Sequence, residues 1–230
     1  MPKISIVVPV FNEEESLDVL FREIREEMER LRQPFEIVFV NDGSTDTSLA
    51  KIKIFQSQLK DAVRIVDLPS RSGQTFALRK GLESTGGDIV VTLDADLQND
   101  PADISRLLEK MNEGFDVVCG WRMDRNDPWL KKKLSKLGNI FQRLISGLTV
   151  HDVSCTLRAY KKECIKKLNL VWEGQHRFIP LMLFKEGCRV GEIASHHRHR
   201  TYGYSKYTHK RVFKVVGDFF KVLFARRSSR

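Results

Sequence analysis

Short apolar segments alternate with longer amphipathic segments through the first 120 residues, and this alternation limits the fold more than any other feature. The run at 4–10 is apolar and β-branched, which is typical of a buried strand. The segment 16–31 then places apolar residues at helical spacing, with charged residues opposite them. Strands that alternate with helices in this way predict right-handed βαβ units, and therefore an α/β fold with a mostly parallel central sheet flanked by helices. Further strands are expected at 36–40, 63–68 and 88–93, and further helices at 48–59, near 76–84 and after Pro101.

The composition excludes several classes of protein. The 230 residues suffice for one sizeable core but not for two independent enzymes. Hydrophobic residues make up 41% and charged residues 30%, which excludes fibrous and disordered chains. No apolar stretch reaches the ~18 residues of a membrane-spanning helix, and no signal-peptide cleavage site follows the first apolar run. We therefore expect a cytoplasmic protein without a transmembrane segment.

Charge is distributed unevenly along the chain. The formal net charge is +9, but residues 1–120 hold 14 Lys and Arg against 22 Asp and Glu, a net −8. Residues 121–230 hold 25 against 8, a net +17. A basic half of this kind indicates an anionic partner, for which nucleic acid, a membrane leaflet and a phosphorylated substrate are the alternatives.

Polar residues gather in the loops that follow the predicted strands. Ligands of open parallel sheets bind beyond the carboxyl ends of the strands, so these loops should line one site. Asp94 and Asp96 follow the fourth strand, and two carboxylates at this spacing can share a hard divalent cation that also takes phosphate oxygens. Gln98 could add a carbonyl oxygen from the same side of an extended segment. The pattern predicts a Mg²⁺ or Mn²⁺ site made by these three residues.

A second strand-end loop contains Asp42 and Asp46 around a Gly-Ser-Thr turn. Both residue positions fit a turn or a helix cap before Ser48. Asp46 is the better cap, and Asp42 is the better candidate for contact with a ligand.

Two basic amphipathic helices are predicted in the second half. Apolar residues recur at 4-3-4-3-4 spacing over 130–148, flanked by several lysines and Arg143. A helix of this kind either packs against the core or lies in a membrane interface, and the sequence leaves both alternatives open. The second helix sets the apolar residues of 212–223 against a polar face made by Arg211, Lys214, Asp218 and Lys221.

The order of the motifs resembles a known family. Residues 8–14 read VPVFNEE, 41–46 read NDGSTD, and 94–98 read DADLQ with Asp100-Pro101 after them. This series resembles the signature of the family 2 glycosyltransferases. Within that family the chain most resembles the dolichol-phosphate (polyprenyl-phosphate) mannose synthases, on the evidence of Gly120-Trp121-Arg122, Asp152, CTLR at 155–158, HRFIP at 176–180 and RTYGYSK at 200–206.

The resemblance implies a Rossmann-like GT-A fold whose catalytic domain spans 1–210. Residues 1–120 would bind the nucleotide-sugar, 121–210 the acceptor, and the amphipathic tail 211–230 would meet the membrane surface. Mg²⁺ or Mn²⁺ would be held by Asp94, Asp96 and Gln98. The donor would be bound by Pro9, Phe11, Glu13, Asp42, Asp94, Ala95, Asp96, Gln98, Arg200, Ser205 and Lys206.

The resemblance also implies the reaction and the groups that carry it. A hexose, best taken as mannose from GDP-mannose, would move with inversion onto a polyprenyl or dolichyl phosphate at the cytoplasmic membrane face. The acceptor phosphate would meet Arg122 and the lysines 131, 132 and 133. A membrane-anchored partner protein is a further expectation. The catalytic residues would be Asp96, Arg122, Asp152, Arg200 and Lys206, with Lys131, Lys132 and Lys133 binding the acceptor.

The sequence departs from the family pattern at two positions, and three alternative interpretations of its function stay open. Ser72 stands where the family commonly has Asn, and Gln74 where it commonly has Lys, so the role of the 71–74 loop is open. UDP-glucose or UDP-N-acetylglucosamine could replace the donor, and a soluble molecule could replace the lipid acceptor. A nucleic-acid-binding module would use the basic half but would leave the acidic strand-end loops unexplained, so we expect no nucleic-acid partner.

Overall fold

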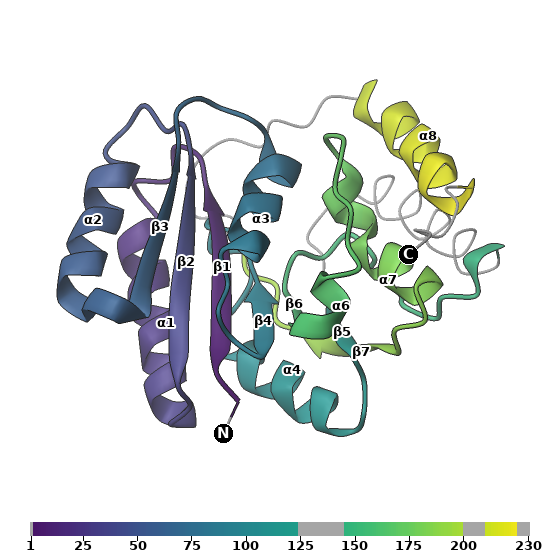
Figure 1. Ribbon diagram of the computed structural model, residues 1–230, viewed down its shortest axis with the longest axis horizontal. Helices are drawn as coiled ribbons and strands as arrows, with labels where there is room; N and C mark the ends of the chain where they lie inside the picture. Colours follow the sequence, from purple (N-terminus) through teal and green to yellow (C-terminus); the bar gives the residue numbers. More distant parts are fainter. Residues whose placement is uncertain (1, 124–144, 200–209, 225–230) are drawn as a thin grey trace.

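The computed structural model describes residues 2–123, 145–199 and 210–224, with the backbone alone given for 210–216. A single mixed sheet runs through the molecule, with helices packed on both of its faces (Figure 1). The strands are β1 (Ile4–Val10), β2 (Phe35–Asp42), β3 (Val63–Leu68), β4 (Ile89–Thr92), β5 (Val117–Arg122), β6 (Arg158–Lys161) and β7 (Val190–Ser195). The helices are α1 (Leu17–Leu31), α2 (Ser48–Leu59), α3 (Gln74–Glu83), α4 (Asp103–Asn112), α6 (Lys162–Ile165), α7 (Ile179–Lys185) and α8 (Lys210–Phe224), with short 3₁₀ helices η1 (Lys60–Ala62) and η2 (Gln175–Phe178).

The strand order is β3-β2-β1-β4-β6-β5-β7. β1 pairs in parallel with β2 and β4, β2 with β3, and β5 with β7. β6 is antiparallel to both of its neighbours, β4 and β5. The carboxyl ends of all the strands except β6 therefore lie along one edge, and β6 brings its first residue, Arg158, to that same edge. The α/β fold and the mostly parallel sheet expected from the sequence are confirmed.

Each face of the sheet is covered by its own apolar core. On one face, α1, α2 and α4 pack against the sheet around the stacked rings of Phe21 and Phe55, whose centroids lie 4.1 Å apart. On the other face, α3 packs against β1 and β2, α7 packs against β5 and β7, and the end of α8 packs on α7 and η2, through residues such as Leu78, Ile179 and Val222. The strands read as continuous apolar runs because both of their faces are covered.

The predicted element boundaries are mostly confirmed. The second strand continues to Asp42, so this residue belongs to the strand and not to the loop after it. The helix expected after Pro101 begins at Asp103, with Ala102 as its N-cap. Most of the basic helix predicted at 130–148 lies outside the described residues, and only its end, from Ile145, is described.

The C-terminal helix α8 packs on the protein with part of its apolar face. Phe219 and Val222 are buried in the same core as α7, and the Phe219 ring lies 6.1 Å from that of Phe178. The prediction that Asp218 lies on an exposed polar face is wrong, because its side chain is buried against Gly174 of the segment before η2. The tertiary packing overrides the helical pattern here. In the part of the chain that the structure describes, no helix is long and apolar enough to cross a membrane.

A close approach between α3 and the sheet depends on Gly81. A Cβ atom at this position would lie 2.8 Å from Val40 Cγ2 and closer still to Val7 Cγ1. Alanine is favoured over glycine by about 1 kcal/mol in a helix interior, but overpacking a core costs about 1–3 kcal/mol. We expect Gly81→Ala to lower the free energy of unfolding, measured by urea denaturation. Gly217→Ala in α8 is the control, because in the described part of the chain no atom beyond its own helix backbone and chain neighbours lies within 4 Å of its added Cβ, and it should leave stability equal or higher.

Candidate functional site

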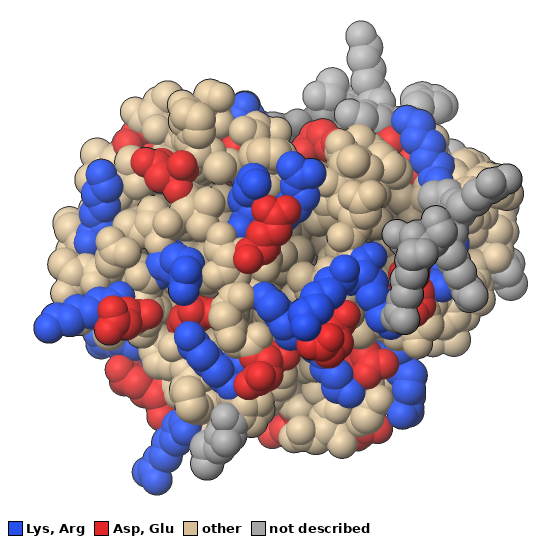
Figure 2. Space-filling view, in the orientation of Figure 1, with Lys and Arg blue, Asp and Glu red and all other residues tan. Residues whose placement is uncertain are grey.

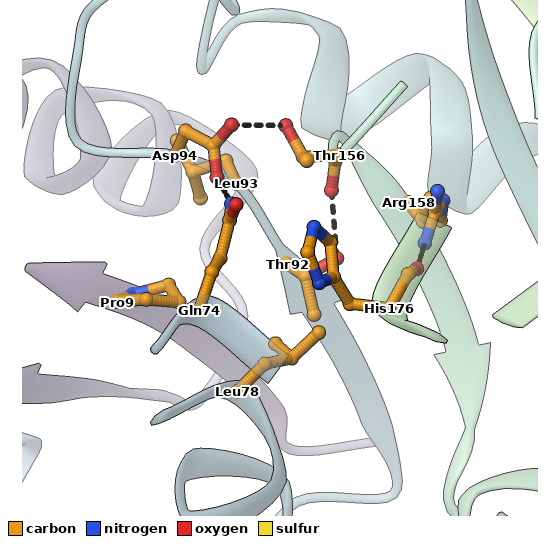
Figure 3. Close-up of a pocket in the computed structure, with 9 residues that line it drawn as sticks. All are labelled: Pro9, Gln74, Leu78, Thr92, Leu93, Asp94, Thr156, Arg158 and His176. Carbon is orange, nitrogen blue, oxygen red and sulfur yellow. Dashed lines mark hydrogen bonds between the residues drawn. The ribbon is translucent and has the colours of Figure 1, made fainter. Parts of the chain in front are cut away.

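The carboxyl end of β4 carries the two predicted metal carboxylates. Asp94 follows β4 directly, and its Oδ1 accepts a hydrogen bond from Gln74 Nε2 at 2.8 Å. Its Oδ2 accepts a hydrogen bond from Thr156 Oγ1 at 2.9 Å, so two neutral side chains hold this carboxylate (Figure 3). Asp96 is buried, and its Oδ1 accepts the backbone N–H of Gln98 at 3.2 Å. The three predicted metal ligands thus lie on one short turn.

The charge of Asp94 is incompletely balanced. Burial and, second, the negative charge of Asp96 together raise the pKa of Asp94 to about 6, although the Thr156 hydrogen bond and the charges of Arg122 and Arg158 oppose the rise. A raised carboxyl pKa means that the ionised form lacks enough positive charge nearby. A divalent cation would supply that charge, so the residues present fit such an ion. Among the described residues no group of three or more His, Cys, Asp or Glu side chains could hold a metal, so the remaining ligands of the ion would come from water or substrate.

Arg122 and Asp152, both predicted to be catalytic, lie together at the end of β5. Arg122 Nε donates to Asp152 Oδ2 at 2.7 Å, and Nη2 donates to Oδ1 at 3.0 Å and to Ser154 Oγ at 2.9 Å. The side chain of Arg122 is 16% exposed and that of Asp152 is 3% exposed. A two-pronged pair of this kind fixes the plane of the guanidinium group.

Trp121 and His151, which precede Arg122 and Asp152 in the sequence, are also in contact. The Trp121 and His151 rings are stacked, with centroids 4.2 Å apart, and His151 also bonds Glu192 of β7 through Nδ1 and its backbone N–H. Successive strand residues point to opposite faces. The stack and the ion pair therefore clamp 121–122 to 151–152 from both sides of the sheet, a contact that the sequence analysis did not predict.

The 71–75 loop has its backbone donors occupied by carboxylates of the protein itself. Asp42 accepts the N–H groups of Ser72 at 2.6 Å and Gly73 at 2.9 Å. Glu173 accepts the N–H of Thr75 at 3.0 Å, at the first turn of α3. A helix N-terminus with free N–H groups would bind phosphate, but here the N–H groups of Ser72, Gly73 and Thr75 are already bonded to carboxylates of the protein. Asp42, predicted to contact the donor, anchors this loop in the structure. Asp46 is predicted to cap the next helix, but the N-cap of α2 is Thr47, and Asp46 accepts the N–H of the first helical residue, Ser48, from one position earlier at 2.9 Å.

Sequence reasoning gave no role to two buried side chains beside the site. His176 Nδ1 lies 2.6 Å from the hydroxyl of Thr75. Arg158 donates to the carbonyl oxygens of Val153 at 2.7 Å and His176 at 2.9 Å. Their motifs carried the family resemblance, which was the only signal for them. Together with residues from β1, α3 and β4 they line a small pocket beneath Asp94, made by Pro9, Gln74, Leu78, Thr92, Leu93, Asp94, Thr156, Arg158 and His176 (Figure 3).

The other predicted donor-binding residues are dispersed around the loops. Pro9 lines the pocket, whereas the Phe11 ring lies under the guanidinium of Arg71, 4.1 Å away. Glu13 bonds Ser48 Oγ through its backbone N–H at 3.0 Å, and Ala95 is buried in the core. The structure therefore brings Asp94, Ala95, Asp96 and Gln98 together, with Pro9 beside them, and places Phe11 and Glu13 in the neighbouring loop.

The segment after β7 lies beside the turn that carries the predicted metal ligands Asp94, Asp96 and Gln98. The N–H of Arg198 donates to the carbonyl of Gln98 at 2.9 Å, and His197 forms a β-bridge with Asn99. Arg198 also pairs with Glu23 and Asp100, each at 2.8 Å. The chain therefore enters the predicted phosphate-binding motif from beside Gln98. Arg200, Ser205 and Lys206 themselves, like Lys131, Lys132 and Lys133, lie outside the described residues.

Basic and acidic side chains are interleaved on the face shown in Figure 2. Among the described residues, oppositely charged side chains also form helical pairs, such as Arg25–Glu29 at 3.4 Å and Lys80–Glu83 at 3.1 Å. The mixed signs in Figure 2 mean that the face shown presents no large field of a single sign.

The chain is similar to proteins of known family. A model described as Glycosyl transferase family 2 matches residues 5–168. A dodecaprenyl-phosphate galacturonate synthase of Rhizobium johnstonii is 36% identical over 98% of this chain and 68% of that protein. An undecaprenyl-phosphate 4-deoxy-4-formamido-L-arabinose transferase of Serratia proteamaculans is 37% identical over 94% of this chain and 66% of that protein. The chain spans about two thirds of the length of these relatives.

Solved structures give the fold independently. Glucosyl-3-phosphoglycerate synthase of Mycobacterium tuberculosis superposes with a TM-score of 0.74 at 19% identity, covering 99% of this chain and 83% of that one. Its complex with Mn²⁺, UDP-glucose and phosphoglyceric acid gives a TM-score of 0.71 at 18% identity, over 99% and 81% of the two chains. These neighbours are GT-A proteins, so the expected GT-A fold is confirmed.

The raised pKa of Asp94 predicts how cation binding depends on pH. Below about pH 6 the carboxyl is protonated, so a cation must displace a proton, whereas above it the carboxylate is ready to bind. We expect the affinity for Mn²⁺, measured by calorimetry, to rise as the pH increases through about 6 and then to level off. An affinity that stays constant between pH 5 and 7 would contradict this prediction.

The Arg122–Asp152 pair should be energetically coupled. A double-mutant cycle of Arg122→Ala and Asp152→Ala, read by urea denaturation, is expected to give about 1–3 kcal/mol of coupling, because both groups are largely withdrawn from water. The exposed pair Lys166–Glu163, with side chains 62% and 76% exposed, serves as the control and should give less than about 0.5 kcal/mol. Equal coupling energies in the two pairs would contradict the prediction, because they would show that burial does not strengthen the Arg122–Asp152 interaction.

Proposed function

Because the chain belongs to the family 2 glycosyltransferases, we propose that it transfers a sugar from a nucleotide-sugar donor to the phosphate of a polyprenyl phosphate. One observation carries the proposal: an under-compensated carboxylate pair at the end of β4 lies within electrostatic reach of the oriented guanidinium of Arg122. A metal-bound diphosphate and an anionic acceptor need this combination of charges. The names of the relatives, which are polyprenyl-phosphate sugar transferases, support the acceptor class.

The mechanism follows from the charge of the acceptor. A lipid phosphate is already anionic near neutral pH, so it can attack the anomeric carbon without first losing a proton to a strong base. A single displacement of this kind inverts the anomeric configuration. The protein then has to position two phosphate groups that repel one another. Arg122 would bind the acceptor phosphate, and Asp152 would keep its guanidinium in plane.

The metal site fits into the same scheme. Asp94, Asp96 and Gln98 would hold Mg²⁺ or Mn²⁺, and the bound ion would neutralise the leaving nucleoside diphosphate. Arg200, Ser205 and Lys206 would add cationic and hydroxyl groups to the donor, and Lys131, Lys132 and Lys133 to the acceptor. In this scheme residues 1–120 serve the donor and 121–210 the acceptor, although both halves share one sheet.

The transferred sugar is the part of the proposal that the comparisons change most. The names of the relatives given above specify galacturonate and 4-deoxy-4-formamido-L-arabinose, and not mannose. Two complexes of the solved neighbour hold UDP-glucose and UDP. We therefore take a UDP-linked uronic acid or 4-modified pentose as the first donors to test, and GDP-mannose as the comparison.

The membrane role rests on the end of α8. The Phe220 and Phe224 rings are stacked 6.1 Å apart, and Phe224 is 76% exposed on the same helix as Lys221, whose side chain is 67% exposed. Aromatic rings next to Lys and Arg suit an anionic lipid surface. We propose that this end of α8 meets the cytoplasmic face of the membrane, where the lipid acceptor lies, with a membrane-anchored partner as a further element.

The test is a donor panel with a short polyprenyl phosphate, scored for lipid-linked sugar with and without Mn²⁺. We expect transfer from at least one donor, loss of about 100-fold or more in Asp96→Ala, and abolition by EDTA. Asp61→Ala, which changes an exposed carboxylate on η1, is the control and should keep full activity. Full activity of Asp96→Ala in EDTA would refute the proposal, and transfer to a soluble acceptor alone would replace the lipid.

A further inference from the structure

Gln74 stands in direct contact with a predicted metal ligand but has no role in the scheme above. Its Nε2 donates to Asp94 Oδ1 at 2.8 Å, while Thr156 donates to Asp94 Oδ2 at 2.9 Å. Asn99 Nδ2 in turn donates to Thr156 Oγ1 at 3.1 Å. Each carboxylate oxygen has two lone pairs. One neutral hydrogen bond on each oxygen therefore fixes the plane of the carboxylate and still leaves a lone pair for a cation.

The backbone next to Gln74 is anchored by residues 173–176, which are distant from it in the sequence. Gln74 is the first residue of α3, and the next residue, Thr75, is held by Glu173 at its N–H and by Gly174 and His176 at its hydroxyl. Asp42 holds the preceding Gly73. The backbone on both sides of Gln74 is thus anchored, so its amide reaches Asp94 from a rigid support.

Gln74 and Thr156 carry no charge, so they can hold the Asp94 carboxylate without cancelling its negative charge. The two arginines whose charges act on Asp94 are engaged elsewhere, Arg122 with Asp152 and Arg158 with backbone carbonyl groups. Among the described residues, the side chains that hydrogen-bond Asp94 are both neutral. The negative charge of Asp94 is therefore not cancelled by either side chain that hydrogen-bonds it and stays available for a cation. A lysine at position 74, as is common in the family, would place an ammonium group against it.

We propose that Gln74 is a positioning residue that orients Asp94 for a divalent cation without neutralising it. The inference rests on the proposed function, whose metal site it deepens. Removal of a group that orients a metal ligand typically weakens metal binding about 10- to 100-fold. The same loss is expected when the hydrogen bond to the other oxygen of Asp94 is removed.

The experiment measures Mn²⁺ binding to the full chain by calorimetry and by the EPR signal of free Mn²⁺, without donor or acceptor. We expect Gln74→Leu and Thr156→Val each to weaken Mn²⁺ binding about 10- to 100-fold. Gln74→Lys keeps a donor but adds a positive charge, so it should also bind Mn²⁺ more weakly than the wild type. Transfer activity lost in Gln74→Leu should return at saturating Mn²⁺, which a misfolded protein would not show.

The matched control is Gln58→Leu, the same substitution at an exposed position on α2, and it should bind Mn²⁺ as the wild type does. Circular dichroism checks that each variant is folded. Gln74→Leu and Thr156→Val that bind Mn²⁺ within twofold of the wild type overturn the positioning role, and a Gln74→Lys with wild-type affinity overturns the argument from charge. A wild-type chain that binds no Mn²⁺ overturns the metal site of the proposed function as well, so the two failures are distinguishable.

Discussion

The guanidinium of Arg158 holds the site together from inside the protein. The side chain is only 1% exposed, and it donates to backbone carbonyls of the turn at Val153 and of η2 at His176 and Arg177. A buried cation is costly unless its hydrogen bonds are made. Here those bonds join three parts of the chain, namely the start of β6, the turn that carries Asp152, and the segment that carries His176. The position of each of these groups depends on Arg158 making all of its contacts.

The charges of the site are kept apart by neutral groups. Arg122 and Asp152 satisfy one another at the end of β5, while Asp94 is held by an amide and a hydroxyl at the end of β4. The two arginines whose charges act on Asp94 hydrogen-bond other groups, Arg122 to Asp152 and Arg158 to backbone carbonyls. Among the described residues, the side chains that hydrogen-bond Asp94 are neutral, so no direct ion pair cancels its charge. In the proposed reaction a cation would meet Asp94 while Arg122 meets an anionic phosphate.

The sequence predicts the elements that local patterns encode, but it does not predict contacts between residues that are far apart in the chain. The strands, the helices and the Asp94-Ala95-Asp96 turn follow from periodicity and from the rule that ligands bind at strand ends. The contacts of Thr75 with Glu173 and His176 join residues about a hundred positions apart, and no local pattern encodes them. The burial of Asp218 shows the same limit, because helical spacing assigns it to a polar face and only the packing of α8 on η2 reverses this.

The antiparallel strand β6 has a consequence for how the molecule assembles. β4 pairs on one side with β1, with Ile89 opposite Ile4, and on the other side with β6, with Thr92 opposite Arg158. Both pairings join residues that are far apart in the sequence, so a long loop must close before either is made. The strand that leads to Asp94 and Asp96 is therefore held on both sides by contacts that no local segment can form alone. Because β6 also begins with Arg158 and follows Thr156, local opening of this one strand would withdraw support from Asp94 and from the Asp152 turn together.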